Sequence, residues 1–169
     1  SDLKNFMTVN RKHVHFYKDM IYRDRKSLNS LGKPLPPKVC HRASINVVVE
    51  QGNHNISEPK NIFKTNSTDI EILHFPLRSF SQFENKIRLG GAAYERNQTL
   101  DKEIGITWRN LYEEYREKGL ESYYQSKVMT ELDIEEGLKD GSLITDARLK
   151  NFFGLVSSNS NLRKTANEP

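Results

Sequence analysis

The sequence predicts a mixed α/β fold, α+β in the isolated chain, with a few strands followed by a helical half. Short runs rich in β-branched residues fall between residues 45 and 75, and helical apolar spacing follows Ser79. Between the first stretch and the strands lie Pro34, Pro36 and Pro37, which a helix does not accommodate. The 169 residues are enough chain for one domain.

The first 75 residues predict one helix and two strands. A helix is expected within residues 3–28, where four apolar residues roughly fit helical spacing: Met7, Val14, Tyr17 and Ile21. The run Val47–Val49 predicts a strand over 45–50, and Gly52-Asn53 predicts the turn that follows it. A polar loop over 55–68 leads to a second strand over 69–75, which Pro76 ends.

Helical signals dominate the remainder of the chain. Ser79 and Gln82 match a capping box at the start of one helix. A second helix is expected from a Thr107 cap to Lys118, with Gly119 as its stop. Shorter helices are expected at 120–129, 131–139 and 146–153, with Thr130 and Thr145 as caps, and a disordered tail at 157–169.

Two strands alone do not form a stable sheet in water. We therefore expect the strands at 45–50 and 69–75 to complete a sheet supplied by an upstream segment or by a partner chain.

Composition excludes several classes of protein. No apolar run approaches the roughly 18 residues of a membrane span, and the first residues do not resemble a signal peptide. Cys40 is the single cysteine, which excludes an internal disulfide and a cysteine zinc site. We expect a soluble, cytoplasmic chain without a membrane span. Residues 1–42 hold ten Lys or Arg against three Asp or Glu, which favours an anionic partner.

Two groups of residues are candidates for a site. Three histidines, His41, His54 and His74, stand at the ends of the expected strands, although their spacing matches no local zinc pattern. Arg78 and Ser79 stand at an expected helix start with Lys86 on the same helix, and such a group suits a phosphate.

Taken together, three stretches resemble the carboxy-terminal part of bacterial family 2 glycosyltransferases. The similarity lies in Leu35–Ala43, in Gln51–His54 and in Leu73–Ser79 with Phe83 and Lys86. It covers about a third of the chain strongly. The last stretch is similar to the family's signature of His-aromatic, basic-Ser, Phe and Lys, which is fairly specific as a set.

This resemblance implies a GT-A fold and metal-dependent, inverting transfer of a sugar from a nucleotide-sugar donor to an acceptor. It implies a divalent metal, Mn²⁺ or Mg²⁺, with His74 as the first candidate ligand and His54 as the second. It also implies that Arg78, Ser79 and Lys86 lie near the leaving diphosphate, and that Lys38 and Arg42 line the same basic cleft. Fixed cations and a metal would stabilise the charge that develops there.

The sequence also departs from the family pattern. It contains no Asp-x-Asp motif and no convincing catalytic carboxylate. We therefore expect the C-terminal part of a GT-A-like catalytic domain at 1–98 and a helical extension at 99–156, with the base outside this chain and no transfer by the chain alone. Two alternatives remain open: a helical protein-interaction module using residues 107–153, and, less favoured, a basic nucleic-acid-binding module.

Overall fold

The computed structural model describes residues 3–29, 32–41, 45–57 and 70–165, and it shows a mixed α/β protein. Within these residues the first half is built from short strands and 3-10 turns: β1 (Leu3–Asn5), β2 (Thr8–Val9), η1 (Phe16–Lys18), β3 (Tyr22–Asp24), β4 (Val48–Val49), η2 (Gln51–Asn53), β5 (Ile56–Ser57) and β6 (Ile72–His74). The second half is mainly helical: α1 (Phe80–Arg96), α2 (Ile106–Lys118), α3 (Glu121–Gln125), β7 (Val128–Met129), α4 (Glu131–Lys139), β8 (Leu143–Thr145) and α5 (Arg148–Thr165).

The helix expected within residues 3–28 is wrong, because this segment forms β1, β2, η1 and β3. Each strand pairs with a strand far along the chain: β1 with β6 in parallel, β2 with β7 in parallel, and β3 with β8 in antiparallel. The four apolar residues that suggested a helix carry no information about such remote partners. Tertiary pairing therefore overrides the local pattern.

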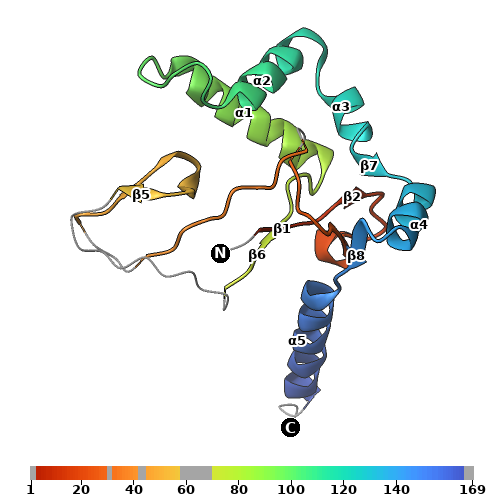
Figure 1. Ribbon diagram of the computed structural model, residues 1–169. Coiled ribbons are helices and arrows are strands. Elements are labelled where there is room, and N and C mark those ends of the chain that lie inside the picture. The colour runs from red at the N-terminus through yellow and green to blue at the C-terminus, as the bar shows by residue number, and fades with distance from the viewer. Residues whose placement is uncertain (1–2, 30–31, 42–44, 58–69, 166–169) are drawn as a thin grey trace.

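The two expected strands exist, and both find partners in this chain. Val48–Val49 pairs with Ile56–Ser57 as a short hairpin, and Ile72–His74 pairs with Leu3–Asn5. Among the described residues every sheet has two strands, although a bridge between Phe6 and Arg23 links β1 to β3. In Figure 1 the β4–β5 hairpin lies apart from the other strands.

Helix α1 begins where the sequence predicts. The Ser79 hydroxyl accepts a hydrogen bond from the Gln82 N–H at 3.2 Å, and the Gln82 side chain reaches back to the N–H of Arg78. Helix α2 packs along α1 (Figure 1), and it begins after Gly105 rather than at the predicted Thr107 cap. Gly105 has a φ of 75°, which glycine adopts without strain, and its carbonyl accepts from the N–H of Trp108.

The predictions for the shorter elements after α1 are confirmed in part. Gly119 ends α2 as expected, and Thr130 caps α4 through a capping box with Asp133. The predicted Thr145 cap is wrong: Thr145 ends β8, and the Asp146 carboxylate accepts from the N–H of Arg148. Because β7 and β8 lie between the helices, the part expected as a helical extension also contributes strands. Helix α5 continues to Thr165, into the stretch expected as a tail, and it projects from the other elements (Figure 1).

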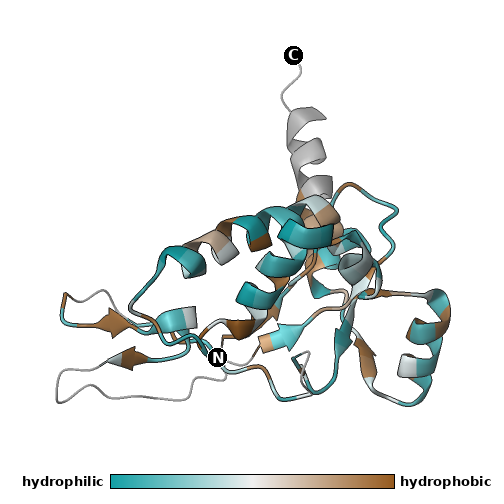
Figure 2. Ribbon diagram, turned by 90° about the horizontal axis from the view of Figure 1, so that it is seen from above, coloured by the Kyte–Doolittle hydropathy of each residue, from teal (hydrophilic) through white to brown (hydrophobic). Residues whose placement is uncertain are grey.

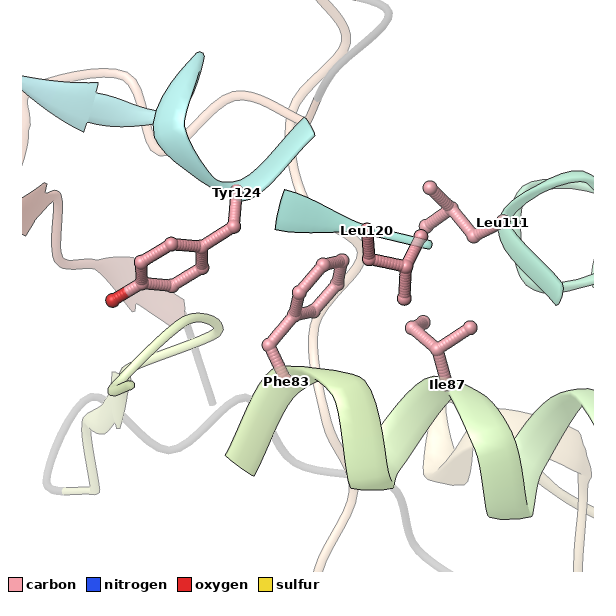
Figure 3. Packing of buried hydrophobic residues seen from close by; sticks show 5 residues of the cluster. All are labelled: Phe83, Ile87, Leu111, Leu120 and Tyr124. Carbon is pink, nitrogen blue, oxygen red and sulfur yellow. The ribbon is translucent and has the colours of Figure 1, made fainter. Parts of the chain in front are cut away.

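The best-packed core is small and lies between α1, α2 and α3. In Figure 3 the side chains of Phe83, Ile87, Leu111 and Leu120 point toward one another, and Tyr124 lies beside Phe83. These five buried residues make up the core. Elsewhere hydrophobic residues occur in short stretches among hydrophilic ones (Figure 2). Within the described residues, no helix combines the length and apolar character needed to cross a bilayer.

An ion-pair network around the buried Asp146 carboxylate joins the N-terminal strands to the C-terminal part. The Asp146 carboxylate is 6% exposed and binds Arg148 at 2.7 Å and Arg23 at 3.1 Å. Arg148 also pairs with Glu71, which lies 3.4 Å from the ammonium of Lys4. The hydrogen bond from Arg148 and the pairing with Arg23 lower the pKa of Asp146 against the opposing effect of burial.

We expect Leu120→Ala to lower the free energy of unfolding by about 2–5 kcal/mol, measured by urea denaturation. Leu120 is fully buried, so the substitution leaves a cavity among Phe83, Ile87 and Leu111. The matched control is Leu132→Ala on α4, where the side chain is 63% exposed and the expected change is below about 0.5 kcal/mol. Equal losses in the two variants would contradict this core.

We expect Asp146→Asn to destabilise the protein by about 1–3 kcal/mol at neutral pH, because charged hydrogen bonds to two arginines are weakened. The folded-state pKa of Asp146 is lowered, so its contribution is present above the ordinary aspartate pKa and is lost as the pH falls through the folded value. The gap between wild type and variant, followed by denaturation across the acid range, should therefore close on acidification. A gap independent of pH would refute the assignment.

Candidate functional site

Lys38 and His54 form the first part of the candidate site. The Lys38 ammonium lies 3.3 Å from His54 Nε2 and also donates to the carbonyl of Gly52. His54 Nδ1 lies 2.9 Å from the carbonyl oxygen of Pro37. Because that oxygen only accepts, Nδ1 carries the proton and Nε2 accepts from Lys38. Both ring nitrogens of His54 are therefore engaged.

Glycine at position 52 makes this arrangement possible. Gly52 has a φ of 73°, and a Cβ there would lie 2.6 Å from Cδ2 of the His54 ring. The predicted turn at Gly52-Asn53 thus has a second role: its missing side chain leaves room for the imidazole.

His74 is positioned by the pairing of β1 with β6. The register places Asn5 opposite His74, and His74 Nδ1 donates to the Asn5 side-chain oxygen at 2.9 Å. The carbonyl of His74 accepts from the N–H of Phe6 at 2.9 Å. Because Nδ1 carries the proton that it donates in this bond, Nε2 of the neutral ring keeps a lone pair.

Arg78 and Lys86 lie on aromatic supports. The Arg78 guanidinium lies over the ring of Phe16, 5.4 Å from its centroid, and Phe16 packs edge-on against Phe75. The Lys86 ammonium lies 5.1 Å from the centroid of a Trp108 ring. Both contacts are cation–π interactions, which hold a cation without neutralising it.

Gly90 lets Trp108 approach α1. A Cβ at Gly90 would lie 2.3 Å from Cζ3 of Trp108, and a Cβ at Gly91 would lie 2.3 Å from Cβ of Tyr112. The absence of side chains at this glycine pair therefore leaves room for two side chains of α2. Trp108 and Tyr112 thus contribute to packing between the helices.

These residues converge into a basic cluster, defined here as Lys38, His54, His74, Arg78 and Lys86. Burial lowers the pKa of His74 most, and the charges of Lys86 and Lys38 lower it further. Burial likewise lowers the pKa of Lys86, followed by the charges of Arg78 and Lys38, despite the attraction of the Trp108 ring. No described carboxylate is among the groups that shift the pKa of His74 or Lys86. The cluster is therefore suited to binding an anion.

The described residues do not by themselves provide a site for a divalent metal. None of them forms a group of three or more His, Cys, Asp or Glu side chains that could hold an ion. The nitrogens of His54 are engaged, and the positive charges of Lys86 and Lys38 near His74 oppose a bound cation. The charges around His74 therefore favour an anion at that position.

Two other expected site residues have different outcomes. Ser79 lies beside Arg78, but its hydroxyl caps α1 by accepting from Gln82. Arg42 lies outside the described residues. Sequence reasoning missed Asn5, which faces His74, and Phe16, which supports Arg78. No local signal marks either residue, because each acts through a partner about 60 or more positions away.

Comparisons of the chain with protein-family models, with curated proteins and with solved structures found no match.

We expect Lys86→Met to raise the free energy of unfolding at neutral pH. The folded-state pKa of Lys86 is lowered, so its protonated form destabilises the folded protein, and wild-type stability should rise as the pH increases toward the ordinary lysine pKa. Loss of the cation–π contact, about 0.5–1 kcal/mol, opposes this gain. The pH-dependent rise should be smaller in the variant.

The matched control is Arg88→Met, which removes an exposed cation from the same helix. Denaturation of the three proteins at several pH values provides the measurement. A Lys86→Met variant that is less stable and keeps the wild-type pH dependence would contradict the prediction. It would show that protonated Lys86 does not destabilise the folded protein.

Proposed function

We propose that this chain is part of a GT-A-type glycosyltransferase that transfers a sugar from a nucleotide-sugar donor, and that the basic cluster binds the donor's diphosphate. The observation that carries the proposal is the convergence of Lys38, His74, Arg78 and Lys86 from separate segments, with lowered pKa values at three of them. In the free protein these groups of like charge are held close together, where they repel one another. A ligand of opposite charge would account for this arrangement.

The geometry of the cluster suits a diphosphate better than a single carboxylate. Arg78 offers a planar set of donors, whereas Lys86 and Lys38 are point charges that can follow separate oxygens. Two linked phosphates carry enough negative charge and enough oxygens to contact several of these cations together. Two of these cations remain accessible to a ligand, since Arg78 is exposed and Lys86 is half-buried.

The chemistry of sugar transfer gives the cluster its role. When an acceptor oxygen attacks the anomeric carbon of the donor sugar, a new carbon–oxygen bond forms. The bond from that carbon to the diphosphate breaks, and the leaving oxygen gains negative charge. Fixed cations in a partly desolvated site stabilise this charge without reorganising. The neutral His74 ring can also take up a proton when the anion binds, because the anion's charge raises its pKa.

The proposal assigns no catalytic base to this chain. It includes the divalent metal implied by the resemblance, although the described residues provide no ligand group for it. The diphosphate brings anionic oxygens of its own, so the test compares nucleotide with and without Mn²⁺. The acceptor is a second substrate, and the chain alone is expected to transfer no sugar.

We expect UDP or GDP to raise the melting temperature of the full chain, because a ligand that binds only the folded state stabilises it. The gain is about 2.7 kcal/mol at a hundredfold excess over the Kd. Lys86→Met should remove most of the shift, and Arg88→Met should keep it. Binding should tighten as the pH falls from about 8 to about 6, since His74 gains a proton on binding.

Three results would count against the proposal. They are a nucleotide shift equal in wild type and Lys86→Met, sugar transfer by this chain alone, and salt-dependent binding of oligonucleotides with no response to UDP or GDP. Inorganic pyrophosphate serves as a further probe: a shift as large as that of UDP would locate recognition in the diphosphate itself.

A further inference from the structure

An apolar patch lies where the start of α5 meets η1. The ring of Tyr17 in η1 contacts the ring of Phe153 in α5, with 4.7 Å between the ring centroids. Three more apolar residues of α5 lie on the same half of the helix, because they are spaced one, three or four positions from one another or from Phe153. We define the α5 patch as Tyr17, Phe152, Phe153, Leu155 and Val156.

The fold leaves most of the α5 patch uncovered. Phe152 is 59% exposed and Leu155 is 67% exposed, and Val156 is also exposed. Helix α5 projects from the other elements (Figure 1), so none of the described elements packs over this face. Single exposed apolar residues are ordinary, whereas a contiguous group of large ones indicates an interaction surface.

Positive charge accompanies the α5 patch. The sequence of α5 contains four basic residues and no acidic residue. Lys150 stands one helical turn before Phe153, and Lys18 directly follows Tyr17. Both lysines are exposed, and neither forms an ion pair with a described carboxylate. The apolar surface therefore has uncompensated cations beside it, which favours a negatively charged partner.

The carboxylates at the base of α5 and at the end of η1 do not cancel this charge. Asp146, just before α5, is bound by Arg148 and Arg23. Asp19, which follows η1, lies 2.7 Å from Nδ1 of His13 and is nearly buried. Since both acids are already engaged, they leave Lys18 and Lys150 available to a partner.

The side chains of the α5 patch distinguish between possible partners. Single-stranded nucleic acid stacks its bases on exposed rings, but Leu155 and Val156 have no aromatic face, and the Phe153 ring already packs against Tyr17 and Phe152. A second copy of the chain would bring two helices of the same charge together. The surface of an anionic bilayer accepts aliphatic and aromatic side chains alike and attracts lysines beside them.

We infer that the α5 patch docks on the surface of a bilayer that contains anionic lipid. Phe152, Leu155 and Val156 enter the headgroup region, and Lys18 and Lys150 lie near the lipid phosphates. This inference does not rest on the proposed function.

The α5 patch borders the basic cluster through one residue. Phe16 contacts Tyr17 edge-on at 5.9 Å, and the same ring lies under the guanidinium of Arg78. Because the basic cluster is also cationic, the experiment includes a variant of each surface.

The test is co-sedimentation of the full chain with lipid vesicles. Vesicles of phosphatidylcholine with about one third phosphatidylserine should bind the chain at least about tenfold more tightly than vesicles of phosphatidylcholine alone. The double variant Phe152→Gln, Leu155→Gln should weaken that binding at least about tenfold, because two apolar side chains no longer leave water. Both residues are exposed and glutamine is a good helix former, so the fold should persist.

The matched control is the double variant Leu89→Gln, Leu132→Gln, which makes the same kind of change at exposed residues of α1 and α4 and should leave vesicle binding unchanged. Lys150→Gln should weaken binding to the anionic vesicles about fivefold, because one cation near the surface contributes about that factor. Lys139→Gln removes the same charge from an exposed position on α4 and should have little effect.

Four outcomes would overturn the inference. They are absence of binding to the anionic vesicles, equal binding by wild type and the Phe152→Gln, Leu155→Gln variant, binding of single-stranded oligonucleotides in place of vesicles, and self-association of the chain through this patch without lipid. Lys86→Met separates the inference from the proposed function: it should lose the response to UDP and keep vesicle binding, whereas the Phe152→Gln, Leu155→Gln variant should show the reverse. Loss of vesicle binding in Lys86→Met alone would place the lipid contact in the basic cluster and contradict the inference.

Discussion

The parallel pairing of β1 with β6 is the constraint on which the candidate site depends. It sets Asn5 against His74 and fixes the tautomer of that ring. It also anchors the chain just before Arg78 and the start of α1, so the positions of Arg78 and Lys86 follow from it. The same N-terminal segment continues through β2 and β3, which pair with β7 and β8. One extended segment therefore contacts the part of the chain that carries His74 and Arg78, whereas Lys38 and His54 are held together within the region of the β4–β5 hairpin.

Charged groups in the basic cluster and in the ion pairs elsewhere contribute to the stability of the fold with opposite sign. Ion pairs such as Arg23–Asp146 combine opposite charges where they are buried, and they lower the pKa of the acid. In the basic cluster, burial first and then neighbouring charges of the same sign lower the pKa of His74 and of Lys86. Such an arrangement opposes folding, and the small core between α1, α2 and α3 must offset it. A bound anion would reverse the sign of this contribution, which is the pattern expected of a binding site.

Local chemistry was predictable from the sequence, and remote pairing was not. The Ser79 cap, the Thr130 cap and the stop at Gly119 each depend on residues within a few positions, and all three are confirmed. The helix expected within residues 3–28 failed because the partners of β1 and β3 lie about 70 and 120 positions away. The same reason separates the candidate residues. Lys86 could be named from its place on the helix that follows Arg78, whereas Asn5 could be found only through strand register.

The loop before α1 is held at two backbone groups by the N-terminal segment. The carbonyl of Leu77 accepts from the Thr8 hydroxyl, and the carbonyl of Arg78 accepts from Arg11. The side chain of Arg78 lies over the ring of Phe16, which belongs to the same segment. The placement of Arg78 in the basic cluster therefore depends on the N-terminal segment, as does the placement of His74 through Asn5.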